Sequence, residues 1–128
     1  MTLLIGATAI ALIVTADPMV VTTMDGYANY VEGYYGSTLI HAHYELAGKY
    51  FLSDKPVKII SNGVVHEYEV IKYGVWDGVS DEFFDWHVED TIVLRTCYPT
   101  FGTVTPRWVV MLREVNDAID RPYTEYIQ

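Results

Sequence analysis

The only cysteine of the sequence, Cys97, ends a run of mostly β-branched and aliphatic residues that begins at Asp90. Pro99 follows two residues later, and proline ends a strand because it has no N–H for a ladder hydrogen bond. A thiol at a strand end is held by rigid backbone and lies beside a loop that can admit a ligand. A lone cysteine is also an ordinary core residue, so its chemistry depends on its partners.

The other residues that thiol chemistry requires are also present. A thiol attacks a carbonyl as the thiolate, and its usual pKa of about 8.5 leaves it mostly protonated at neutral pH. A histidine can exchange the proton, and an arginine can stabilise the oxyanion. The chain has four histidines, and Arg107 opens the β-like run after the cysteine loop. In strand alternation Cys97 shares a face with Arg95, and the nine-residue loop could place Cys97 beside Arg107.

Length and composition limit the class of protein. A chain of 128 residues predicts one domain, residues 1–128. The formal charge of −9 argues against binding to nucleic acid or to anionic lipid. A single cysteine excludes an intrachain disulfide. No cysteine or histidine spacing indicates a metal site and no glycine loop indicates phosphate binding, so we expect no cofactor.

The N-terminal segment from Leu3 to Val14 is nearly all apolar. We expect a buried strand, followed by a turn at Asp17-Pro18. The alternative is a secretory signal, because Val14-Thr15-Ala16 resembles a signal-peptidase site. No basic residue precedes the apolar run, however, and about a dozen residues are too few to span a bilayer.

The rest of the chain alternates short β-like runs with turns. Asn62-Gly63 between two apolar runs predicts a β-hairpin, and a helical turn is expected after His41. Asp25–Gly36, rich in tyrosine and glycine, is interpreted as a surface connection. One short helix is expected within the acidic stretch Val75–Glu89, and Arg113–Asp120 is compatible with a helix. The other expected strands are Met19–Met24, Ser37–His41, Val57–Ile60, Val64–Tyr73 and Trp108–Leu112. This pattern favours an all-β barrel or sandwich.

Three segments resemble the sortase family. Val93-Leu-Arg-Thr-Cys97 is similar to the family's Thr-Leu-x-Thr-Cys signature, with valine in place of the first threonine. Arg107-Trp-Val-Val110 is similar to the segment that carries the catalytic arginine. Thr38-Leu-Ile-His-Ala-His43 resembles the strand that ends in Gly-His, with Ala42 where glycine is usual.

The resemblance implies a small closed β-barrel of seven to eight strands with one or two short helices. It also implies a cysteine transpeptidase in which Cys97 attacks an LPxTG-like sorting signal of a surface protein. His43 would be the general acid and base, and Arg107 would hold the substrate or the oxyanion. His41 competes with His43 for the role of the histidine, and Arg95, on the face of Cys97, could substitute for Arg107, although the family match favours Arg107. We expect Thr96 and Arg95, beside the cysteine, to bind substrate.

The resemblance further implies an amine acceptor from the cell wall or a pilin, and a location at the surface of a bacterium. Two other functions stay open: a thiol peptidase that uses water, and a catalytically silent barrel that binds peptides. Some members of the family use calcium, although acidic loops are usually solvated surface. The acidic residues available here are Glu32, Asp77, Asp81, Glu82 and Asp85.

Overall fold

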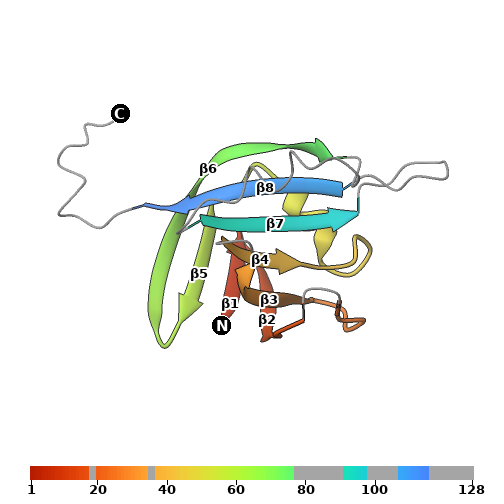
Figure 1. Ribbon diagram of the computed structural model, residues 1–128. Helices are drawn as coiled ribbons and strands as arrows, with labels where there is room; N and C mark the ends of the chain where they lie inside the picture. Colours follow the sequence, from red (N-terminus) through yellow and green to blue (C-terminus); the bar gives the residue numbers. More distant parts are fainter. Residues whose placement is uncertain (18–19, 35–36, 77–90, 98–106, 116–128) are drawn as a thin grey trace.

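A computed structural model describes residues 1–17, 20–34, 37–76, 91–97 and 107–115. Within these ranges eight strands close into a barrel in the order β1-β2-β3-β4-β7-β8-β6-β5 (Figure 1). The all-β barrel expected from the sequence is therefore confirmed. The strands are β1 (Thr2–Ile5), β2 (Thr8–Val14), β3 (Tyr27–Tyr34), β4 (Ser37–His41), β5 (Val57–Ser61), β6 (Val64–Trp76), β7 (Thr91–Cys97) and β8 (Arg107–Glu114), and one 3-10 helix, η1, spans Gly48–Leu52.

The N-terminal apolar segment forms two strands rather than the single strand expected. Gly6 adopts a positive φ of 60° and turns the chain between β1 and β2. β1 also pairs with β5, which closes the barrel. Leu3 and Ile10, one from each strand, are completely buried. No described helix is long and apolar enough to cross a membrane.

Two other expectations for the first third of the chain are wrong. The segment from Asp25 to Gly36 is not a connection, because Tyr27–Tyr34 forms β3, parallel to β2 and antiparallel to β4. The described residues of the run expected at Met19–Met24 form no strand. The Thr22 N–H donates to the side-chain oxygen of Asn29 at 2.6 Å instead of to a neighbouring strand.

The hairpin at Asn62-Gly63 is confirmed. Both residues have positive φ, 52° and 77°, and Ser61 pairs with Val64 across the turn. β8 extends to Glu114, so Arg113 and Glu114 are strand rather than helix. The rest of the helix expected to Asp120, and the short helix expected in the acidic stretch, fall outside the described residues.

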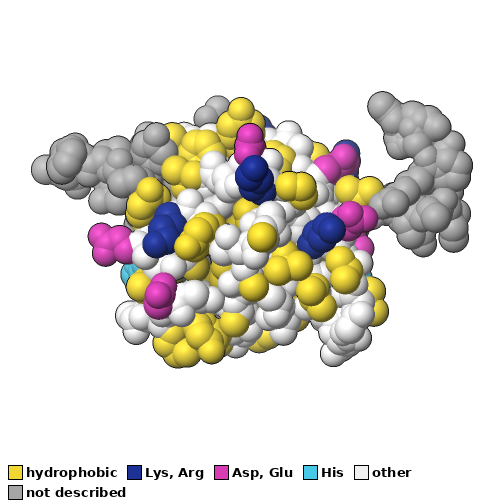
Figure 2. Space-filling view, turned by 180° about the vertical axis from the view of Figure 1, so that it is seen from behind, with side chains coloured by type: hydrophobic (Ala, Val, Ile, Leu, Met, Phe, Trp, Pro, Cys, Tyr) yellow, Lys and Arg dark blue, Asp and Glu magenta, His cyan; other side chains and the backbone are white. Residues whose placement is uncertain are grey.

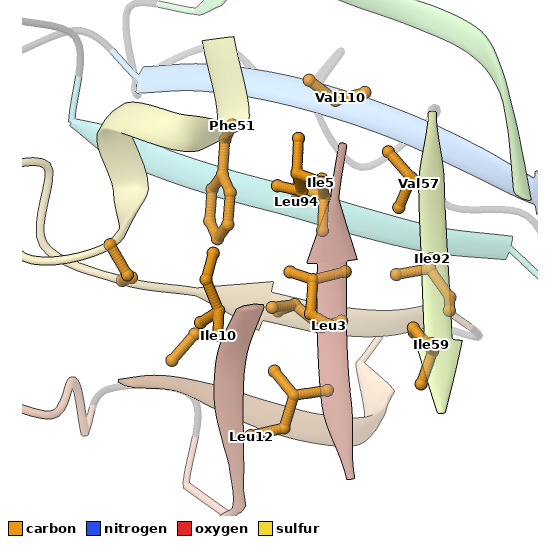
Figure 3. Packing of buried hydrophobic residues seen from close by; sticks show 14 of the residues in the cluster. Leu3, Ile5, Ile10, Leu12, Phe51, Val57, Ile59, Ile92, Leu94 and Val110 are labelled. Atoms are coloured by element: carbon orange, nitrogen blue, oxygen red, sulfur yellow. The ribbon is translucent and has the colours of Figure 1, made fainter. Parts of the chain in front are cut away.

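The barrel interior is filled by one face of the strands. Every second residue of a strand points inward, as Ile92 and Leu94 do on β7. Phe51 of η1 enters the same core and lies above Ile10 in Figure 3. Each Å² of apolar surface that is removed from water contributes about 25 cal/mol to stability, so this core is the main stabilising contribution. A second cluster lies on the opposite, outer face of β3, β4, β7 and β8 and contains Val31, Leu39, Val93, Val109 and Met111.

β6 is the strand with the most exposed apolar surface among those described. Its exposed residues are Val64, Val65, Val70, Ile71, Tyr73 and Val75. Figure 2 shows the face turned away from the viewer of Figure 1, where hydrophobic side chains form several groups with Lys, Arg, Asp and Glu side chains between them.

Candidate active site

The pairing of β7 with β8 brings the cysteine and arginine positions together. In this antiparallel ladder the Cα partner of Cys97 is Arg107. Such partners have Cα atoms about 4.5–5.5 Å apart. Thr96 and Trp108, the neighbouring pair, belong to the inner face.

His43 follows the end of β4, which runs parallel to β7 with His41 opposite Arg95. The Ala42 N–H donates to the Arg95 carbonyl at 3.3 Å, and the Ala42 carbonyl accepts the Thr96 hydroxyl at 2.9 Å. These bonds hold the chain that leads into His43 beside the end of β7, and β4 and β7 both run toward the right in Figure 1. The His43 side chain is exposed, and its carbonyl accepts the N–H groups of the following turn.

The segment after His43 is fastened to both strands that carry the candidate residues. Trp108, next to Arg107, donates its indole N–H to the Phe51 carbonyl of η1 at 2.9 Å. Gly48 lies so close to Thr96 that a Cβ at position 48 would overlap the threonine side chain. Inner-face residues adjacent to positions 97 and 107 therefore fix the path of the chain that leaves His43.

The fold has counterparts of known structure. The chain is similar to sortase A of Listeria monocytogenes, with a TM-score of 0.59, 15% identity, and coverage of 95% of this chain and 94% of that one. It is also similar to sortase C1 of Streptococcus agalactiae, with a TM-score of 0.67, 14% identity, and coverage of 94% and 69%. The fold is that of the sortases.

A third counterpart is Clostridium perfringens sortase C, solved with the C-terminal cell wall sorting motif. Its TM-score is 0.61 with 18% identity, and the similarity covers 90% of this chain and 69% of that one. No family model and no curated protein matches the sequence. At these identities the likeness establishes the sortase fold and leaves the sortase class open.

On this sortase fold the two competing histidines have different surroundings. His41 is 3% exposed, and its Nδ1 lies 3.2 Å from Nη2 of Arg95. Arginine has no acceptor, so the guanidinium donates and Nδ1 accepts, which places the proton of the neutral ring on Nε2. That buried Nε2 has no partner at normal hydrogen-bond geometry among the described residues, although the Val20 backbone interacts with the ring and favours its protonated form. His43, in contrast, is open to solvent.

Burial is the main cause of the altered titration of His41. Removal of the ring from water, followed by the nearby positive charge of Arg95, lowers the pKa of His41 to about 4. The Val20 backbone partly opposes this pKa shift, and His43 adds a smaller lowering. His41 is therefore neutral at physiological pH.

The two residues that we expected to bind substrate lie on opposite faces of β7. Thr96 is 2% exposed, and its hydroxyl is engaged with Ala42 on the inner face. The Thr96 side chain is too buried to contact a bound peptide, and its hydrogen bond instead holds the chain next to His43 in place. Arg95 is half-buried on the outer face and contacts His41.

Sequence reasoning missed the inner-face hydrogen bonds of Thr96 and Trp108, and it missed the contact between His41 and Arg95. The alternation along β7 and β8 does place Thr96 and Trp108 on the inner face, but the carbonyls they bind belong to Ala42, just after β4, and to Phe51 of η1. The pairing of β4 with β7 joins residues more than fifty positions apart, and no local pattern predicts it. Among the described residues, no three His, Cys, Asp or Glu side chains gather where they could hold a metal ion.

Proposed function

We propose that residues 1–128 form a sortase-like cysteine transpeptidase domain that acts on a sorting-signal peptide. The observation that carries this proposal is the Cα pairing of Cys97 with Arg107 at the end of the barrel where His43 follows β4. The sortase fold supports the reaction class. The structure solved with a sorting motif supports a peptide substrate.

In the proposed reaction the Cys97 thiolate attacks a backbone carbonyl of the peptide and forms a C–S bond. Arg107 stabilises the negative charge on the carbonyl oxygen. His43 donates a proton to the leaving nitrogen as the C–N bond breaks, which leaves a thioester on Cys97. His43 then removes a proton from an incoming amine, the amine attacks the thioester, and the thiolate departs.

The exposed His43 suits this exchange better than the buried His41. A general acid that serves two successive substrates has to meet both the leaving amine and the incoming one. His41 has Nδ1 engaged with Arg95, and its low pKa makes it a weak base. The acceptor amine would belong to the cell wall or a pilin, which implies work at the surface of a bacterium.

The test is a product analysis with LPxTG-like peptides, with and without hydroxylamine as the amine acceptor. The proposal predicts a hydroxamate of the N-terminal fragment, formed by the wild type and absent with Cys97→Ala. Formation of the free acid alone at saturating hydroxylamine would indicate a thiol peptidase. No product from any peptide would favour a silent peptide-binding barrel.

A further inference from the structure

The turn between β5 and β6 consists of an asparagine followed by a glycine, Asn62-Gly63. In the part of the chain that the structure describes, Asn62 is the one residue other than glycine with a positive φ, 52°. A two-residue hairpin loop of this kind needs positive φ at both positions, which asparagine and glycine tolerate. The turn thus selects two residues whose side chain and backbone can also react with each other.

Both residues of the turn are open to solvent. Asn62 and Gly63 are exposed, and a Cβ atom at position 63 would meet nothing within 4 Å. The ladder of the hairpin ends with the pairing of Ser61 and Val64, so the Gly63 N–H lies in the loop and takes no part in the pairing of the strands. Water therefore reaches the Asn62 amide, and the Gly63 nitrogen is not crowded.

An asparagine side chain can react with the backbone nitrogen that follows it. The Gly63 nitrogen, on losing its proton, forms a bond to Cγ of Asn62, and the bond from Cγ to the side-chain nitrogen breaks, so that ammonia leaves. The product is a five-membered succinimide ring, whose closure is intramolecular and needs no other reactant. Water then opens the ring at one of its two carbonyls, which gives aspartate or isoaspartate. Glycine favours the ring closure because it has no Cβ to obstruct the attacking nitrogen.

Asn29 has the opposite surroundings. It is 2% exposed, its side-chain oxygen accepts from the Thr22 N–H at 2.6 Å, and its side-chain nitrogen donates to the Thr15 hydroxyl at 2.8 Å. Tyr30 follows it, and a residue with a Cβ obstructs the attack that glycine permits. The barrel thus protects Asn29 from this reaction and leaves Asn62 accessible to it.

We propose that Asn62-Gly63 is a site of spontaneous modification, at which the folded protein forms a succinimide and then aspartate and isoaspartate. The reaction needs only water and is independent of the transpeptidase function, because the turn is built from β5 and β6 alone.

The two products affect the hairpin differently. Aspartate tolerates positive φ and keeps the two-residue loop. Isoaspartate adds a carbon atom to the main chain of the loop, which changes the register that the turn imposes on Ser61 and Val64. β5 also pairs with β1 to close the barrel, and its Val57 and Ile59 are 5% and 3% exposed. The isoaspartate form is therefore expected to be the less stable of the two.

Peptide mapping after several weeks of incubation in warm, mildly alkaline buffer tests the site. Trypsin cleaves after lysine and arginine, so each of the three asparagines falls in a different peptide, with Asn62 in residues 59–72. We expect that peptide to gain the mass that replacement of NH2 by OH produces, and to separate into two forms by chromatography. The peptide that contains Asn29 is expected to keep its mass.

Gly63→Asp is the matched control, because aspartate also tolerates positive φ and the space around position 63 is empty. It keeps Asn62 but obstructs the attacking nitrogen, so the rate of modification is expected to fall by about tenfold or more. Asn62→Gly retains a Gly-Gly turn and should abolish the mass gain. An unchanged mass of residues 59–72 in the wild type, or an equal rate in Gly63→Asp, would overturn the proposal.

The effect on the barrel has its own readout. Asn62→Asp has the covalent structure of one product and is expected to unfold at the same urea concentration as the wild type. The isoaspartate form, separated from the incubated protein by hydrophobic-interaction chromatography, is expected to unfold at a lower concentration. Equal midpoints for these two proteins would show that the modification leaves the hairpin undisturbed.

Discussion

At the scale of single residues, His41 and His43 show what sequence alone leaves open. In the sequence, alternation places both on the same face of a strand, and Gly48 and Phe51 follow both of them. The structure separates them by burial, since His41 is enclosed beside Arg95 whereas His43 lies beyond the strand end, open to solvent. Burial of His41 depends on β3 and β7, which come from distant parts of the chain, so local sequence could not predict it.

The first prediction concerns these two histidines. His43→Ala is expected to slow thioester formation by about 10²–10⁴-fold, the usual contribution of a positioned general acid or base. His41→Ala is expected to slow it less than tenfold per folded molecule. Single-turnover rates, corrected for the folded fraction, make the comparison. A larger loss with His41→Ala than with His43→Ala would show that His43 is not the general acid.

The second prediction concerns stability and pH. The pKa of His41 is lowered to about 4 in the folded chain, whereas an unfolded histidine titrates at about 6.5. Between these values the unfolded state binds more protons, so the free energy of unfolding falls as the pH is lowered from about 6.5 to about 4. The loss is about 2 kcal/mol once partial solvation is allowed for.

Urea denaturation at several pH values measures this contribution. His41→Gln removes the titrating ring and keeps an acceptor for Arg95, so its stability is expected to fall less over the same pH range. A slope that is unchanged in His41→Gln would contradict a buried neutral His41.

At the scale of elements, η1 is the component that holds the candidate site together. Its carbonyl at Phe51 accepts from Trp108, and its first residue, Gly48, packs on Thr96. Sequence signals predicted a helical turn here and the hairpin at Asn62-Gly63, because both depend on local conformational preferences. They failed for β3, whose tyrosines and glycines suggest a loop, because β3 is stabilised by pairing with β2 and β4.

The third prediction concerns the contact between η1 and β7. Gly48→Ala is expected to lower the free energy of unfolding by about 1–3 kcal/mol, because the new methyl group overlaps Thr96 and lies 3.0 Å from the Ala42 carbonyl. It should also reduce thioester formation by displacing the His43 segment. Chemical denaturation and single-turnover kinetics provide the two measurements.

Gly74→Ala is the control for this substitution. Gly74 lies in β6 without a positive φ, and a Cβ there meets nothing within 4 Å. Its stability and activity are expected to stay close to those of the wild type. If Gly48→Ala behaved like Gly74→Ala, the close packing of Thr96 on η1 would have no role in stability or activity.

At the scale of the whole molecule, barrel closure creates the candidate site. β4 and β7 are parallel neighbours, and β7 is antiparallel to β8, so the ends of β4 and β7 meet the start of β8. The sequence predicted that the loop could bring Cys97 and Arg107 together, and the two positions are paired in the ladder. The parallel pairing that adds His43 was implied only by the resemblance to sortases, because non-local pairings leave no local signal. The comparisons establish this shared fold.

The central claim is that Cys97 at this strand end forms a thioester with a peptide. The most direct test is intact-mass spectrometry of the protein after mixing with an LPxTG-like peptide, with hydroxylamine added to one aliquot. The account predicts a mass gain equal to the N-terminal fragment, absent in Cys97→Ala and removed by hydroxylamine. No adduct with any peptide of the panel, together with a native Cys97 inert to iodoacetamide, would contradict it.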